Sequence, residues 1–173
     1  MMHPYTWYRI LRLIHIYSAI VLVGAIIFNT VVLMPALRRI PPAHSAVVSQ
    51  KIGGGLMTLG GWAIVLLGVT GFSRLWVLGQ LRHVFSWEVI RLPHLRWDLL
   101  MMVSWFGLLV TGALSAIWYK TILTRKLPYS AGLRDLEERR AAQQKVAAWQ
   151  DRLAYFNLSL ALLAALGGIL ASF

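Results

Sequence analysis

The sequence predicts an all-α protein, a bundle of four transmembrane helices with a cytoplasmic helical extension between the third and fourth spans. Of its 173 residues, 58% are hydrophobic and 13% are charged, whereas about a quarter of a typical soluble domain is charged. Four stretches contain no Lys, Arg, Asp or Glu: 13–37, 52–73, 99–119 and 153–173. Each reaches the roughly 20 residues that cross a bilayer. Residues 1–173 therefore form one integral membrane domain, which excludes a soluble enzyme and, with no Cys, a disulfide scaffold.

The first span contains His15, about one helical turn inside its outer boundary. A polar side chain is costly at that depth, so it needs a strong partner. Two interpretations stay open: a neutral imidazole hydrogen-bonded to a neighbouring helix, or an imidazole that binds haem or a metal ion.

The second span has glycines at seven-residue intervals, Gly54, Gly61 and Gly68. Small residues on one stripe allow another helix, or a flat macrocycle, to approach the backbone closely. Helix packing alone is a sufficient explanation of the pattern. The connection that follows mixes apolar and basic residues and predicts a short amphipathic helix at the headgroups.

The third span begins with His94, Asp98 and Met101 on one face, at the depth of His15. For Asp98 we consider an ion pair with a nearby arginine, or a role as a proton relay or as the acceptor that orients an imidazole. Met101 is either a packing residue or a ligand. His3 and His83 belong to the same side, whereas His44 lies opposite, and such loosely placed histidines are a weak sign of a metal site.

The third connection alternates acidic and basic residues at helical spacing over 134–152. This pattern predicts a solvated helix that continues into the fourth span. The fourth span opens with Asn157, at the predicted depth of Asn29 in the first, so these two amides are candidates to bond to each other.

The basic residues predict the orientation of the chain in the membrane. Eleven Lys and Arg lie on the side of the first and third connections and six on the side of the termini. The positive-inside rule then places the first and third connections in the cytoplasm and both termini outside. We expect the membrane to be the inner or plasma membrane of a bacterium. Anionic lipid headgroups are the expected partners of these charges, and we expect no nucleic-acid partner.

Several catalytic motifs are absent from the sequence: it has no Walker loop, no dinucleotide fingerprint and no HExxH. No span carries two histidines about 14 residues apart, the spacing typical of helices that hold two stacked haems. At most one haem is therefore expected.

The sequence resembles the copper-resistance D (CopD-like) membrane family and its relative, the haem-containing membrane protoporphyrinogen oxidase. The resemblance rests on His15 followed by Gly24 and Phe28, on the glycine-rich second span that ends at 68–72, and on the segment 157–160. It implies a four-helix bundle with a site open to the outer face and His15 as its leading ligand.

Three functions follow as alternatives. In the first, a b-type haem serves electron transfer or redox chemistry, with His15 and His94 as axial ligands, Gly61 and Gly68 making room for the ring, and Arg12 or Arg96 pairing with propionates. In the second, the outer histidines and Met101 or Met102 receive copper. In the third, the chain is a cofactor-free subunit or assembly factor. A redox partner or a periplasmic metal carrier would be the corresponding protein partner.

Overall fold

The computed structural model describes residues 4–118, 121 and 133–171, and this part of the chain is helical with no strand. The elements in chain order are α1 (Pro4–Ile27), the π-helix η1 (Phe28–Leu33), α2 (Met34–Leu37), α3 (Pro42–Val77), α4 (Leu81–Val84), α5 (Glu88–Arg91), α6 (Pro93–Trp118) and α7 (Leu133–Leu170).

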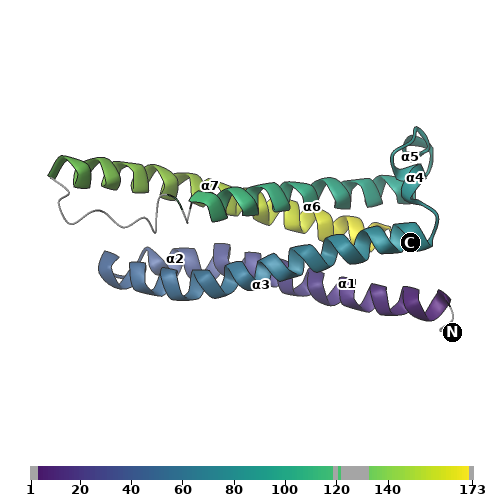
Figure 1. Ribbon diagram of the computed structural model, residues 1–173, viewed down its shortest axis with the longest axis horizontal. Coiled ribbons are helices and arrows are strands. Elements are labelled where there is room, and N and C mark those ends of the chain that lie inside the picture. Colours follow the sequence, from purple (N-terminus) through teal and green to yellow (C-terminus); the bar gives the residue numbers. More distant parts are fainter. Residues whose placement is uncertain (1–3, 119–120, 122–132, 172–173) are drawn as a thin grey trace.

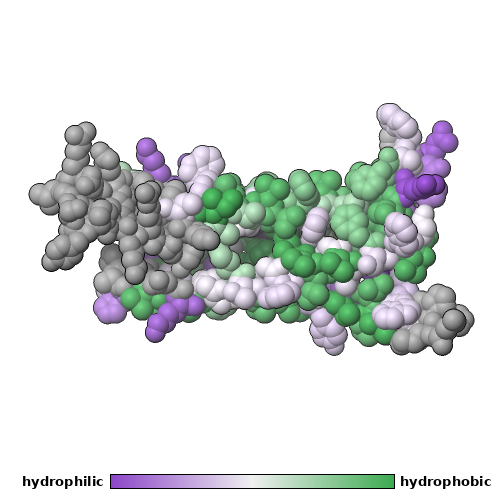
Figure 2. Space-filling model, viewed as in Figure 1, coloured by the Kyte–Doolittle hydropathy of each residue, from purple (hydrophilic) through white to green (hydrophobic). Residues whose placement is uncertain are grey.

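Four of the helical segments are long and apolar enough to cross a membrane. They run over Thr6–Leu37, Val47–Val77, Pro93–Trp118 and Ala148–Leu170. Figure 2 shows apolar side chains over the middle of the molecule and hydrophilic ones towards its two ends. The predicted all-α class, with four helices long and apolar enough to span a membrane, is therefore confirmed.

The helix α7 begins well before the apolar part of the fourth span. Its 38 residues rise about 57 Å at 1.5 Å per residue, nearly twice the thickness of a hydrocarbon core of about 30 Å. The predicted helix over 134–152 is therefore present and continuous with the fourth span (Figure 1).

The connection between α3 and α6 differs from its prediction. Instead of one amphipathic helix it contains two single turns, α4 and α5, separated by a short bend. Beside them Trp76, Phe85 and Trp87 are 75%, 69% and 85% exposed. Large aromatic side chains of this kind favour the boundary between lipid and water.

The four long helices pack as two antiparallel pairs, α1 with α3 and α6 with α7. The pairs meet where α1 contacts α7 and α3 contacts α6, while α1 and α6 lie diagonally across the bundle. Both termini lie at one end of the bundle, beside α4 and α5 (Figure 1). We call this the terminal end.

The centre of the bundle is an apolar layer to which each long helix contributes. Its buried members are Leu22 of α1, Ala63 of α3, Leu108 of α6 and Ala161 of α7. Small and large side chains alternate across the layer, which allows the helices to approach closely. The candidate site lies between this layer and the terminal end.

Candidate functional site at the terminal end

The His15 imidazole is half-buried and bonded to the neighbouring helix α3. Its Nδ1 lies 2.9 Å from Thr70 Oγ1, and Thr70 Oγ1 donates to the Leu66 carbonyl at 2.6 Å. A hydroxyl has one proton and a carbonyl only accepts, so Thr70 accepts from the Nδ1–H of His15. In the neutral ring this assigns the lone pair to Nε2, the nitrogen that is then able to bind a metal.

A glycine on α3 allows this close approach. A Cβ added at Gly71 would lie 3.3 Å from His15 Cε1, tighter than an ordinary van der Waals contact. Gly71 follows Thr70 directly, so one short segment of α3 supplies both the hydrogen bond and the space for the ring.

Arg74 lies one turn beyond Thr70 and was not singled out from the sequence. Its Nη2 donates to the Tyr8 hydroxyl at 3.4 Å, and its Cζ lies 5.5 Å from the centre of the Tyr8 ring. Its Nε is buried and has no hydrogen-bond partner within the described part of the chain. The charge of Arg74 acts on both His15 and Asp98, so it lies near both of them. The signal that could have found it is its position directly after the uncharged stretch 52–73.

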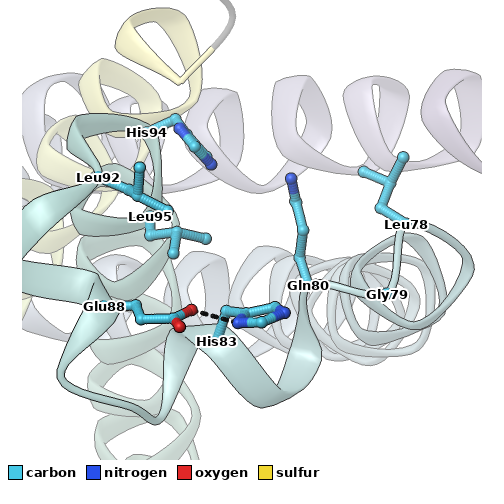
Figure 3. A pocket seen from close by; sticks show the side chains of 8 residues that line it. All are labelled: Leu78, Gly79, Gln80, His83, Glu88, Leu92, His94 and Leu95. Atoms are coloured by element: carbon cyan, nitrogen blue, oxygen red, sulfur yellow. Dashed lines mark hydrogen bonds and ion pairs between the residues drawn. The ribbon is translucent and has the colours of Figure 1, made fainter.

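His94 is exposed and lines a shallow pocket of about 280 Å³ at the terminal end. Figure 3 shows His94 and Gln80 directed into this pocket, with His83 and Glu88 at one side. His83 Nδ1 is hydrogen-bonded to Glu88 Oε2. We call this hollow the terminal pocket; it is lined by Leu78, Gly79, Gln80, His83, Glu88, Leu92, His94 and Leu95.

Asp98 lies one turn deeper than His94 on the same face of α6. It is half-buried, and both Arg74 and His94 act on it electrostatically. Asp98 and His15 therefore both lie near Arg74. This agrees with the similar depth in the membrane that the sequence predicts for them. The terminal pocket, however, includes His94 and not His15.

The other candidate residues have different surroundings. Met101 packs against α7, where its Sδ would lie 3.4 Å from a Cβ added at Gly168. A Cβ at Gly68 would lie 2.5 Å from Cζ2 of Trp105, so that glycine makes room for a side chain of this protein. Gly61 faces open space, with no atom within 4 Å of an added Cβ.

The two arginines predicted to hold propionates are both exposed. Arg12 lines a hollow formed by α1 alone, together with Arg9, Leu13 and Ile16. Arg96 follows Leu95, a residue buried against Leu75 and Val84. His3 lies outside the described residues.

Within the described ranges, no three His, Asp or Glu side chains come close enough to hold a metal ion. The site therefore consists of one oriented imidazole, a half-buried guanidinium and a half-buried carboxylate. No protein family, curated protein or solved structure matches this chain.

Proposed function

We propose that this chain is an integral membrane protein that binds one b-type haem near its terminal end and takes part in electron transfer or redox chemistry. The observation that carries the proposal is the bond between His15 Nδ1 and Thr70. A histidine that ligates a metal almost always donates its other ring N–H to an acceptor, which holds the tautomer and the ring orientation.

A haem fits this donor set better than a copper ion does. The porphyrin supplies four nitrogens itself, so one axial imidazole is enough to hold the iron. A copper ion bound by protein side chains needs several of them together, and the described residues contain no such group of His, Asp or Glu. Met101, the thioether expected to assist copper, packs against α7.

Arg74 is the residue best placed to accept a carboxylate of the cofactor. It is close to His15 and retains a buried Nε–H without a hydrogen-bond partner in the described part of the chain. A guanidinium binds a carboxylate through paired N–H donors. We therefore assign a haem propionate to Arg74 in place of Arg12 or Arg96, which are both exposed.

When bound, the haem supplies one-electron chemistry. The protein residues do the rest: His15 presents Nε2 to the iron, Thr70 holds the ring against α3, and Arg74 offsets the charge of a propionate inside the low-dielectric bundle. Asp98 is the nearby group able to carry a proton.

We further propose that the chain lies in the inner or plasma membrane of a bacterium with both termini outside. The support is the eleven basic residues on the side of the first and third connections against six on the side of the termini. The extension at the start of α7 is then cytoplasmic, and the site opens towards a redox partner outside.

The visible spectrum of the purified protein and of two histidine variants tests the haem proposal. His15→Ala removes the Soret band while the bundle stays folded, because Ala is a good helix former. His44→Ala, an exposed position near the start of α3 at the opposite end of the bundle, keeps the band. A full Soret band in His15→Ala contradicts the ligand assignment.

Two further variants refine the site. Thr70→Val keeps the shape of the side chain but removes the acceptor, and we expect roughly 10- to 100-fold weaker haem binding. His94→Ala reproduces the effect of His15→Ala only if both imidazoles bind the iron. Stoichiometric copper without a Soret band favours the copper alternative, and the absence of both favours a cofactor-free subunit.

A further inference from the structure

The terminal pocket lies at the depth where two membrane spans end. The span of α3 ends at Val77 and that of α6 begins at Pro93. The lining residues 78–80 and 94–95 therefore come directly after the one span and at the start of the other. The exposed Trp76 beside the pocket is typical of the boundary between lipid and water. A molecule dissolved in the membrane can therefore reach this pocket from the lipid.

A tight turn and a small buried cluster hold the pocket in place. Gly79 has φ +68°, and directly after it the Gln80 N–H donates to the Leu75 carbonyl at 2.9 Å. Leu75, Val84 and Leu95 are buried against one another, and Leu95 also lines the pocket. The pocket is thus formed without a ligand, as is usual for sites that bind small molecules.

Polar groups lie at two ends of the terminal pocket, with leucines between them. Figure 3 shows His94 at one end and the hydrogen-bonded pair of His83 and Glu88 at the other, with Leu92 and Leu95 between. A neutral imidazole offers one donor and one acceptor, and a carboxylate accepts several hydrogen bonds, so the bond from His83 leaves Glu88 able to accept from a ligand. The matching ligand has a polar group at each end of an apolar body.

The size and charge of the pocket narrow the class of ligand further. Its volume of about 280 Å³ is at the lower end of the range of ligand pockets, about 300–1,000 Å³, which suits a single ring. The residues that line it include the carboxylate of Glu88 and no Lys or Arg. A lipid phosphate or another anion is therefore disfavoured, because like charges repel each other.

We infer that the terminal pocket binds the ring of a membrane quinol, the reduced form of a quinone, with the apolar tail of the quinol in the lipid. A quinol carries hydroxyl groups at opposite positions of one ring, which corresponds to the polar groups at the two ends of the pocket. One hydroxyl bonds to His94 and the Gln80 amide, which are both directed into the pocket (Figure 3). The other donates to Glu88, and the leucines contact the ring.

The Glu88 carboxylate selects the reduced form. A quinol hydroxyl donates a proton to the hydrogen bond, whereas a quinone oxygen only accepts and would face the lone pairs of the carboxylate. The inference adds to the proposed function a partner that arrives through the membrane. Binding of the quinol itself does not require the haem.

Calorimetric titration of the purified full chain in micelles measures the affinity for decylubiquinone and for its quinol. The protein is reduced before the quinol is added and oxidised before the quinone is added, so no electron transfer contributes heat. Micelles without protein give the heat of partitioning. The variants are Gln80→Leu and Glu88→Gln, and the matched control is Gln144→Leu, an exposed position in the early part of α7, away from the terminal end (Figure 1).

The wild-type chain is expected to bind the quinol more tightly than the quinone. Gln80→Leu weakens the binding of both forms by roughly 2- to 10-fold, the effect of one lost hydrogen bond. Glu88→Gln removes a charged acceptor and weakens the binding of the quinol by roughly 10- to 100-fold. It does not weaken the binding of the quinone, so the preference for the quinol is lost. Gln144→Leu leaves both affinities unchanged.

Three results would overturn the inference. One is heat that does not exceed partitioning into empty micelles, and another is equal loss of both forms in Glu88→Gln. The third is displacement of the quinol by phosphatidylglycerol, which would assign the pocket to a lipid headgroup. The wild-type preference for the quinol needs no variant, so it stays measurable if Glu88→Gln does not fold. The Soret band of His15→Ala tests the haem proposal alone, so the failure of either proposal is distinguishable from the failure of the other.

Discussion

Two glycines of α3, seven residues apart in one predicted stripe, are expected to respond oppositely to the same substitution. At Gly68 an added Cβ would lie 2.5 Å from Cζ2 and 3.1 Å from Cε2 of Trp105. At Gly61 it would have no atom within 4 Å. Comparing the stabilities of Gly68→Ala and Gly61→Ala therefore shows which glycine of the stripe is in close contact with another helix.

The expected change in the free energy of unfolding follows from the contacts of the Trp105 ring. Its Nε1 donates to the Ile64 carbonyl at 2.8 Å, and its edge packs on Phe72 with ring centres 5.9 Å apart. Overpacking costs about 1–3 kcal/mol, and loss of the hydrogen bond costs about 0.5–1.5 kcal/mol. The higher helix propensity of Ala offsets about 1 kcal/mol. Gly68→Ala is thus destabilising by about 0.5–3.5 kcal/mol, whereas Gly61→Ala is neutral or stabilising by up to about 1 kcal/mol.

Unfolding in mixed micelles with increasing dodecyl sulfate measures the free energies of unfolding of Gly68→Ala and Gly61→Ala. A second substitution tests the mechanism: Trp105→Leu removes the ring, so it should cost less in the Gly68→Ala background than in the wild type. Equal stability of the two alanine variants, or strictly additive effects of Gly68→Ala and Trp105→Leu, would refute the argument that the ring sets the cost.

The four spans could be predicted because lipid imposes a strong constraint on composition. A stretch without charges marks the part of a helix that lies in hydrocarbon, but it does not mark where the helix ends. The helix α3 starts at Pro42 and ends at Val77, and α7 starts at Leu133. Outside the lipid α7 is rich in Ala, Gln, Glu and Arg, which are good helix formers, and α3 begins with Pro42 in its first turn, a position that suits proline, so both helices continue beyond their uncharged stretches.

Arg74 escaped prediction for the same reason. The uncharged stretch stops at residue 73, so Arg74 was counted as a topological charge at the boundary. In the structure α3 continues past it, and packing against α1 buries its Nε. Whether a boundary arginine turns inward depends on how two helices are rotated about their axes, which no local pattern encodes.

The predicted amide pair shows this dependence on rotation in another way. Asn157 was a candidate partner of Asn29, but its Oδ1 accepts from Thr111 of α6. The helix α7 packs closely along α6, and the π-helix η1, which follows α1 and contains Asn29, changes the rotation of the chain there. There Thr30 is buried and bonds to the Ala154 carbonyl of α7 at 3.5 Å. The depth of each asparagine in the membrane could be predicted from its position in the span. Which residue at that depth faces the neighbouring helix could not.

Three further predictions concern the connections and the α6–α7 contact. Gly79→Ala costs about 1–2 kcal/mol in the same unfolding assay, because Gly79 has φ +68° and a Cβ is disfavoured in that region. In intact cells an impermeant thiol reagent labels Ser86→Cys and not Ser45→Cys, and the reverse pattern overturns the proposed orientation. Thr111→Val keeps its shape but removes the hydroxyl that lies 2.6 Å from Asn157 Oδ1. Hydrogen bonds between membrane helices contribute about 0.6–1.7 kcal/mol, so Thr111→Val lowers the free energy of unfolding by that amount, whereas Thr111→Ser, which keeps the hydroxyl, lowers it less. Equal losses in the two variants would show that the lost contact is the methyl group and not the hydrogen bond.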